Sequence, residues 1–228
     1  MRDLSGLAHC NAFKRCMSFL PELQTLWLFT IAAVLLTITP GPDMTLFLSR
    51  AISHGRAAGM ACMLGASTGV LFHTMFAAIG LSALLAASAT AFSVVKICGA
   101  LYLIFLAYQA IRYGSALSVD SDGEAKPMSL WRHYLTGIGI NLANPKIILF
   151  FVSFLPQFVS ADDPHFAGKL SFLGVYFLVI AIPMVTPMIL AAHWLADVLK
   201  RSPRVARGMD YLFASVFGIF AIKVLTDR

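Results

Sequence analysis

Two short polar stretches interrupt the apolar sequence, and they hold the residues best suited to chemistry. The first, Thr39-Pro40-Gly41-Pro42-Asp43, carries a carboxylate, and the second, Asn144-Pro145-Lys146, carries an ammonium group. Asp43 suits the binding of a substrate ammonium or a proton, although a carboxylate at a helix start can also serve only as a cap. Lys146 at a helix start opposes the helix dipole, so we expect Asp43 to be its partner. A lysine that reaches from a shallower break to the membrane surface is the alternative.

Other polar residues near these stretches have two readings each. His73 is either a hydrogen-bonded interior histidine or a proton carrier, because imidazole titrates near neutral pH. Asn141 and Asn144 satisfy backbone groups around the second stretch or bind a polar ligand. The candidate binding and coupling residues are Pro40, Gly41, Pro42, Asp43, His73, Asn141, Asn144, Pro145 and Lys146. No catalytic residue, metal ligand or cofactor is predicted, so we expect no enzyme.

Composition places the chain in a membrane. Its 228 residues are 59% hydrophobic and 12% charged, whereas an average protein has about 25% charged residues. The mean hydropathy is +0.80. This length accommodates about six spans of ~20 residues with short loops. The net charge of +6 does not indicate nucleic-acid binding, because the basic residues stand at span ends, where they set orientation.

The elements that must position the polar stretches are therefore membrane helices. The predicted spans are about 23–51, 58–87, 91–113, 134–158, 170–194 and 211–225. Prolines break the first and fourth spans and free the carbonyls of Leu36, Ile38 and Asn141. In hydrocarbon such groups must be covered by protein or line a wet cavity, so both breaks should face inward. Pro183 and Pro187 predict a kink in the fifth span.

A stripe of small residues predicts close helix packing in the second span. Ala61, Gly65, Gly69, His73 and Ala77 recur every fourth residue and share one helix face. Small residues at this spacing let another helix backbone approach closely. His73 should therefore lie on a packed face.

The two broken spans predict two halves of three helices in opposite orientations. Laying Gly41-Pro42-Asp43 over Asn144-Pro145-Lys146 also places Phe47 over Phe150. Interrupted hydrophobic segments in corresponding positions point to a transporter's binding site. The predicted fold is all-α, with six transmembrane helices arranged as two inverted three-helix repeats.

The chain divides into a short extension and one transporter domain. Residues 1–16 are predicted to be a poorly ordered extension, and Met17 is an alternative translation start. The domain covers residues 17–228, with a first half at about 20–113, a connector at 114–130 and a second half at about 131–228. The loops after the first, third and fifth spans hold more Lys and Arg than the other side. The basic side is normally cytoplasmic, so both termini are expected in the periplasm.

These motifs resemble the LysE/RhtB family of bacterial amino-acid exporters. The resemblance rests on the first break with Asp43, the run from Gly65 to His73, the third-span run from Gly99 to Tyr108, and Asn141-Leu-Ala-Asn144-Pro145-Lys146 followed by Pro156-Gln157-Phe158. It implies export of neutral or basic amino acids such as homoserine, threonine, lysine and leucine, or close derivatives. It also implies antiport with protons across the bacterial inner membrane. The expected partners are an amino acid, protons and the lipid bilayer, and a homodimer is left open.

Other classes of membrane protein are alternatives to an exporter of amino acids. A thiol-disulfide electron carrier needs two cysteines that meet near the breaks, and Cys62 and Cys98 stand away from both. Cys10 and Cys16 complete the set of cysteines, which has neither CxxC spacing nor a histidine at metal-ligand spacing. An exporter of metal cations or of another small metabolite remains a separate alternative, although one acid and one histidine offer few metal ligands.

Overall fold

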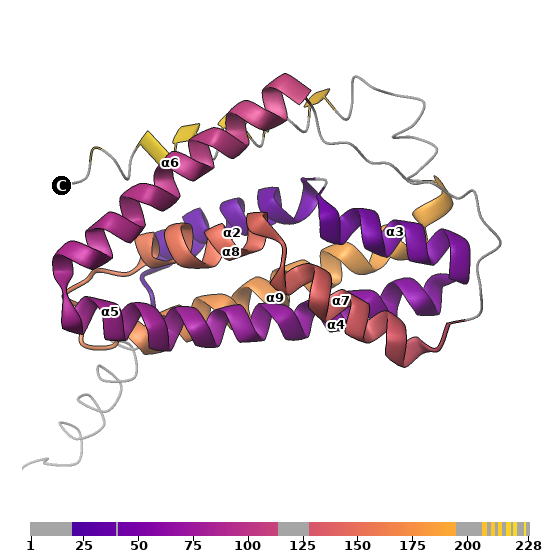
Figure 1. The fold of residues 1–228 in the computed structure, drawn as a ribbon, viewed down its shortest axis with the longest axis horizontal. Helices are drawn as coiled ribbons and strands as arrows, with labels where there is room; N and C mark the ends of the chain where they lie inside the picture. The colour runs from indigo at the N-terminus through magenta and orange to yellow at the C-terminus, as the bar shows by residue number, and fades with distance from the viewer. Residues whose placement is uncertain are drawn as a thin grey trace, which may run out of the picture.

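The computed structural model describes residues 20–39, 41–113 and 128–194, together with short pieces between 207 and 226. Every regular element in these residues is helical (Figure 1). The predicted N-terminal extension, nearly all of the connector and about half of the sixth predicted span lie outside the described residues, as does Pro40. The predicted all-helical architecture is confirmed, and the predicted six-helix inverted repeat remains a prediction.

Both predicted helix breaks are confirmed. Helix α2, Leu23–Ile38, is followed by α3, Pro42–His54, with a bend of 49° between them. Helix α7, Leu130–Leu142, is followed by α8, Pro145–Leu149, and the bend is 52°. A π-helical turn, Phe150–Phe154, and a 3₁₀ turn, Leu155–Phe158, extend α8. The two broken helices run in opposite directions (Figure 1).

Four further helices pack around the broken pair. Helix α4, Arg56–Phe76, continues through a π-helical turn, Ala77–Leu81, into α5, Ser82–Ala87. Helix α6 is Ala89–Tyr113 and helix α9 is Phe166–Leu190. Helix α9 runs through Pro183 and Pro187 as one helix.

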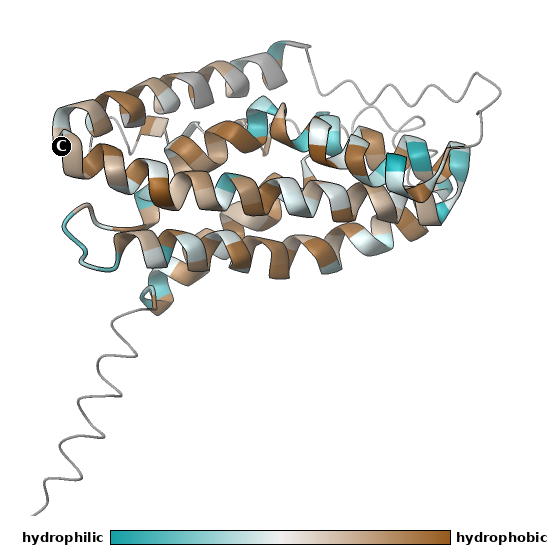
Figure 2. Cartoon of the chain, turned by 60° about the horizontal axis from the view of Figure 1, so that its bottom comes forward, coloured by the Kyte–Doolittle hydropathy of each residue, from teal (hydrophilic) through white to brown (hydrophobic). Residues whose placement is uncertain are grey.

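Some of the described helices have the length that membrane crossing requires. Two of them, Arg56–Ala87 and Phe166–Leu190, are long and apolar enough to cross a membrane alone, and the number becomes four if each bent pair is one span. A crossing needs about 20 apolar residues. Large apolar side chains cover the outside, and Trp27, Phe76 and Val179 are each more than 60% exposed. Figure 2 shows hydrophobic residues along the helices, and the chain is a membrane protein.

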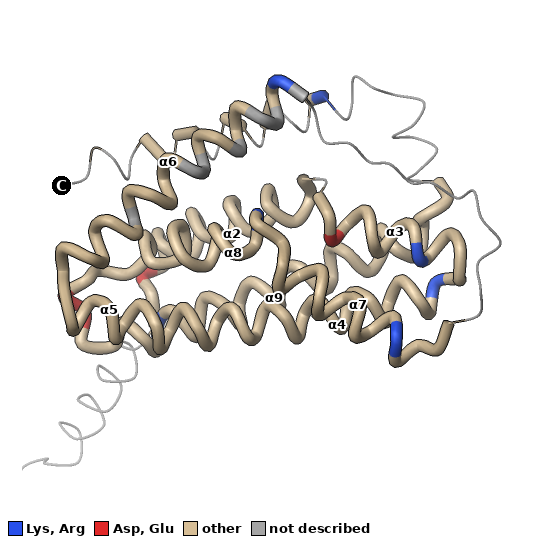
Figure 3. Tube along the Cα trace, viewed as in Figure 1, with Lys and Arg blue, Asp and Glu red and all other residues tan. Residues whose placement is uncertain are grey.

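Charged residues gather at the ends of the helices. Arg50 near the end of α3, Arg56 at the start of α4 and Arg132 in the first turn of α7 lie at one end of the bundle. Figure 3 shows this gathering of Lys and Arg on the right-hand side. Glu22 and Asp163 lie at the opposite end, before α2 and before α9.

Small residues bring α4 and α7 into close contact, as the stripe in the second span predicts. A Cβ at Gly65 would overlap the main-chain carbonyl of Tyr134, and one at Gly137 would overlap that of Cys62. A Cβ at Gly69 would lie 2.5 Å from Asn141 Oδ1. The two helices therefore touch backbone to backbone, and this contact fixes the depth of Asn141.

The described residues form two apolar clusters in the interior. The larger one is aromatic, and Phe29, Phe150 and Phe154 within it are fully buried. The ring centroids of Phe29 and Phe158 are 5.2 Å apart in an edge arrangement, which aromatic pairs prefer. The second cluster joins α3, α4 and α9 through residues such as Phe47, Met63 and Ile189.

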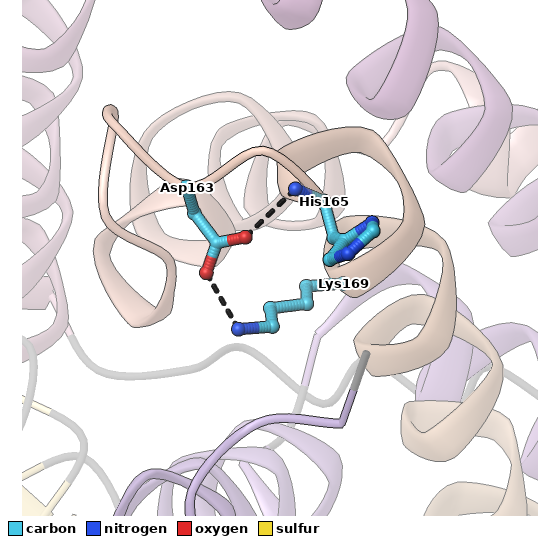
Figure 4. Close-up of polar contacts among 3 residues, drawn as sticks. All are labelled: Asp163, His165 and Lys169. Atoms are coloured by element: carbon cyan, nitrogen blue, oxygen red, sulfur yellow. Dashed lines mark hydrogen bonds and ion pairs between the residues drawn. The ribbon is translucent and has the colours of Figure 1, made fainter. Parts of the chain in front are cut away.

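A polar turn precedes α9 at the acidic end of the bundle (Figure 4). Asp163 Oδ1 accepts a hydrogen bond of 2.8 Å from the His165 N–H, and Oδ2 pairs with Lys169 Nζ at 2.5 Å. The hydrogen bond from Lys169 holds the pKa of Asp163 below its usual value. The sequence predicts a turn at Asp162-Asp163-Pro164, and the structure confirms it.

Candidate functional site

The first break presents an uncapped helix start beside a lysine. Gly41 precedes α3 in an extended conformation, and no side chain caps the first N–H groups of α3. Pro42 occupies the first turn, where its missing N–H costs no hydrogen bond. A Cβ at Gly41 would lie only 3.1 Å from Lys146 Nζ. Gly41 therefore leaves room for the ammonium group at the start of α3.

The helix that follows the second break, α8, has a side-chain cap. The Asn144 side-chain carbonyl accepts a 3.0 Å hydrogen bond from the Lys146 N–H, at the start of α8. Asn144 thus satisfies a backbone group, which is one of its two predicted roles. The two breaks differ in this respect, because α8 has a side-chain cap and α3 has none.

Lys146 connects the second break to the first one. Its Nζ donates to the Leu36 carbonyl at 3.1 Å and to the Thr39 carbonyl at 2.9 Å. Both carbonyls lie at the C-terminal end of α2, where the helix dipole is negative and favours a cation. An ammonium group has three donors, so these two bonds leave one available.

The predicted ion pair between Lys146 and Asp43 is wrong as a direct contact. Among the described residues, Lys169 and Asp163 form an ion pair within 4.0 Å, and Lys146 and Asp43 do not. Asp43 Oδ2 instead accepts a 2.7 Å hydrogen bond from Asn141 Nδ2. The carbonyls of α2 are the direct partners of Lys146, and Asp43 stabilises its charge from beyond contact distance.

His73 lies beside the breaks without entering the cavity described below. Its Nε2 lies 3.3 Å from the Asn141 carbonyl. Pro145 cannot donate to this carbonyl as a helical residue would, and the Asn144 N–H donates to it instead at 3.0 Å. Its ring stacks on Phe151 with centroids 5.8 Å apart. His73 is half-buried and lies on the face of α4 that packs against α7, as the stripe predicts.

A cavity of about 80 Å³ begins at the two breaks and extends between α3, α4 and α9. It has room for several water molecules, each of which needs about 10–15 Å³. Of the nine candidate residues, Asp43, Asn141 and Lys146 line it. Among the described residues that line it, Asp43 and Lys146 alone are ionisable. The rest of the lining is mostly apolar.

Several polar atoms at the breaks are buried without a partner. In the described part of the chain these include Asp43 Oδ1, Asn141 Oδ1 and Asn144 Nδ2, none of which has a hydrogen-bond partner. Leaving such groups unpaired is costly, and native structures rarely do so without a functional reason. Asp43 and Asn141 line the cavity, so the site holds two unpaired acceptors that a polar ligand can satisfy, whereas Asn144 lies beside Asp43 and off the cavity lining.

Sequence reasoning missed two contributions to this site. It gave no role to α9, yet Ala181, Val185 and Met188 form one wall of the cavity. Their helical spacing is visible in the sequence. Every face of α9 is apolar, however, so the spacing alone does not show which face lines the cavity. It also missed the Thr39 carbonyl as a partner of Lys146.

Within the described ranges, no three His, Cys, Asp or Glu side chains lie close enough to hold a metal ion together. Cys62 is a buried free thiol and Cys98 is an exposed one.

Comparison with known proteins gives the family. The model of the LysE type translocator family matches residues 34–228. The homoserine/homoserine lactone efflux protein of Salmonella typhimurium is 31% identical over 200 residues, which cover 88% of this chain and 95% of the relative. An uncharacterized membrane protein of Vibrio cholerae is 33% identical over 194 residues, or 84% of this chain and 92% of the relative.

A further relative matches a smaller part of this chain. The membrane protein YrhP of Bacillus subtilis is 34% identical over 147 residues, or 61% of this chain and 70% of the relative. No solved structure matches the fold. The family match covers most of the chain, and the Salmonella relative is matched along nearly its whole length. The chain therefore belongs to the family of LysE type translocators.

Proposed function

We propose that this protein is a secondary transporter that exports amino acids or close derivatives across the inner membrane in exchange for protons. The observation that carries the proposal is a cavity in which one carboxylate and one ammonium group lie at two facing helix breaks. An amino acid carries the two complementary charges. The Salmonella relative, which is named for efflux of homoserine and its lactone, supports this class of substrate.

The substrate's ammonium group is assigned to Asp43 and Asn141. Asp43 Oδ1 and Asn141 Oδ1 are buried acceptors without a partner, and the Asn141 amide holds the carboxylate in place. An ammonium group provides three donors for such acceptors. These contacts would replace the water that the substrate loses on entering the cavity.

The substrate's carboxylate is assigned to Lys146 and the start of α3. The lysine has one donor left after its bonds to Leu36 and Thr39, and the first N–H groups of α3 have no side-chain cap. An uncapped helix start is a favourable place for an anion. Gly41 keeps this place open, because a larger residue would press on the lysine.

Asp43 also supplies a physical basis for proton coupling. It is the one acidic residue among the described residues that line the cavity. The carboxylate can hold a proton or a substrate ammonium, but not both at once. Ionisable residues at membrane depth are costly and serve in proton relays. Protonation from outside would then release the substrate, and His73, which bonds the Asn141 carbonyl, would support this exchange.

Orientation follows from the charge distribution. The end that holds Arg50, Arg56 and Arg132 is assigned to the cytoplasm, because cytoplasmic loops carry the excess of Lys and Arg. Both termini are then periplasmic. The two halves rock about the breaks, so that the site opens to one side of the membrane at a time.

Inside-out membrane vesicles test the proposed activity, because export appears there as uptake. Vesicles with and without the protein receive an imposed proton gradient and labelled homoserine, threonine, leucine or lysine. We expect protein-dependent uptake of at least one of them, and its loss when a protonophore collapses the gradient. No uptake of any amino acid by folded protein would overturn the proposal.

A further inference from the structure

The cavity has a polar end and an apolar body. Its polar end lies at the breaks, with Asp43, Asn141 and Lys146. The remaining residues that line it from α3, α4 and α9 are almost all apolar, among them Phe47, Met63, Val70, Ala181, Val185 and Met188. A substrate bound by its charged groups at the breaks would therefore extend its side chain into an apolar space.

The two hydroxyl groups on the lining do not change this character. Thr37 Oγ1 donates to the Ala33 carbonyl at 2.7 Å, and Ser67 Oγ donates to the Met63 carbonyl at 2.9 Å. Each hydroxyl therefore gives its proton to its own helix. A charged or strongly polar substrate side chain would find no described counterion in the body of the cavity, and such burial is unfavourable.

Helix α9 forms the wall of this apolar body. Ala181, Val185 and Met188 follow one another at helical spacing and lie on one face. Two contacts with α4 place these residues along the bundle: Thr186 Oγ1 of α9 lies 3.9 Å from the Met63 sulfur, and Ile189 packs against Gly59. Asn141, at the second break, packs against Gly69, which comes later in α4 than Gly59 and Met63. Val185 and Met188 therefore lie between the breaks and the start of α4.

We infer that the cavity accepts the side chain of a neutral, apolar amino acid, and that Val185 and Met188 of α9 set the size it admits. This inference rests on the proposed function and narrows its substrate class. Each buried methylene strengthens binding by about fourfold. Leucine and methionine should therefore bind more tightly than homoserine, and lysine should be excluded because its second ammonium group would be buried unpaired.

The first test compares substrates in the inside-out vesicles of the wild-type protein. We expect uptake of leucine and methionine with a KM about tenfold below that of homoserine, as two or more buried methylenes predict, and no uptake of lysine. Preferred uptake of homoserine or lysine would overturn the inference and leave the proposed function standing. No uptake of any amino acid would overturn both.

The second test changes the wall of the cavity. Val185→Phe should reduce leucine and methionine uptake by about tenfold or more, because the larger ring occupies their side-chain space, and alanine uptake should remain. Val179→Phe is the matched control, since Val179 lies on the same helix and is 62% exposed on its outer face. Equal loss for alanine and leucine in Val185→Phe would overturn the assignment.

A third variant keeps the test decisive if Val185→Phe does not fold. Val185→Ala enlarges the same space, so phenylalanine uptake should rise above the wild-type level while leucine uptake continues. An unchanged substrate profile in Val185→Ala would show that α9 does not set the size of the side chain. Gel filtration of each variant in detergent verifies folding before transport is compared.

Discussion

Lys146 on α8 donates a hydrogen bond of 2.9 Å from its Nζ to the main-chain carbonyl of Thr39, at the end of α2. This bond joins the second break to the first one. A positively charged side chain at the start of a short helix would be unfavourable by itself, because the helix dipole is positive there. It is stabilised here because it also lies at the negative end of another helix. The two breaks therefore form one structural unit.

Removing the lysine should destabilise the fold. Lys146→Met leaves the Leu36 and Thr39 carbonyls without their donor, and hydrogen bonds to charged groups contribute about 1.5–3 kcal/mol each. We expect a loss of about 3 kcal/mol, measured as a lower midpoint of thermal unfolding in detergent. Lys169→Met is the control, because its ion pair lies in the turn before α9. An equal effect of the two substitutions would contradict the bridging role of Lys146.

The close contact of α4 with α7 predicts different outcomes for two glycines. Gly65→Ala would drive a methyl group into the Tyr134 main chain, whereas Gly139→Ala, on α7, meets nothing within 4 Å. Overpacking against backbone costs about 1–3 kcal/mol, and an alanine in an open helical position gains up to about 1 kcal/mol. Thermal unfolding should show Gly65→Ala below and Gly139→Ala at or above the wild type. The reverse order would refute the packing of these helices.

The side-chain cap of α8 can be tested by two substitutions of Asn144. Asn144→Ala removes the acceptor for the Lys146 N–H, and loss of such a cap costs about 1 kcal/mol. Asn144→Ser restores an acceptor and should recover most of the stability. Denaturation curves in detergent compare the three proteins. If the alanine and serine variants are equally stable, Asn144 does not act as a cap.

The turn before α9 should give a pH-dependent contribution to stability. The folded-state pKa of Asp163 is lowered mainly by the hydrogen bond from Lys169. A lowered pKa stabilises the folded state above the unfolded value of about 3.9, and this stabilisation is lost as the pH falls through the folded pKa. Asp163→Asn should therefore lower the unfolding midpoint slightly at pH 6 and have less effect near pH 3. An effect that is the same at both pH values would contradict this account.

The sequence predicts the breaks well because their causes are local. Pro42 and Pro145 each lack an N–H and follow a residue, Gly41 or Asn144, that is typical of a helix start. The proline alone is not enough, because α9 continues through Pro183 and Pro187. The small-residue face of α4 is predicted for a similar reason, since Gly65 and Gly69 repeat at one helical period. These features depend on covalent structure and spacing, which the sequence states directly.

The partners of the charged groups could not be predicted in the same way. The sequence favours Asp43 as the partner of Lys146, because the two residues occupy corresponding positions. The structure gives Lys146 two carbonyls of α2 and gives Asp43 the Asn141 amide. Which partner a long side chain reaches depends on the rotation and depth of each helix. The sequence does not show the rotation or the depth of a helix such as α9, because every face of α9 is apolar.

The most direct test of the site is gradient-driven uptake into inside-out vesicles by Asp43→Asn, compared with Asp163→Asn. The account predicts that Asp43→Asn loses uptake by about a hundredfold, because breaking a buried charge interaction costs about 3 kcal/mol. Asp163→Asn, which changes a carboxylate in the turn before α9, should retain it. Uptake by Asp43→Asn at the wild-type rate would contradict the assignment of substrate binding and proton coupling to the facing breaks.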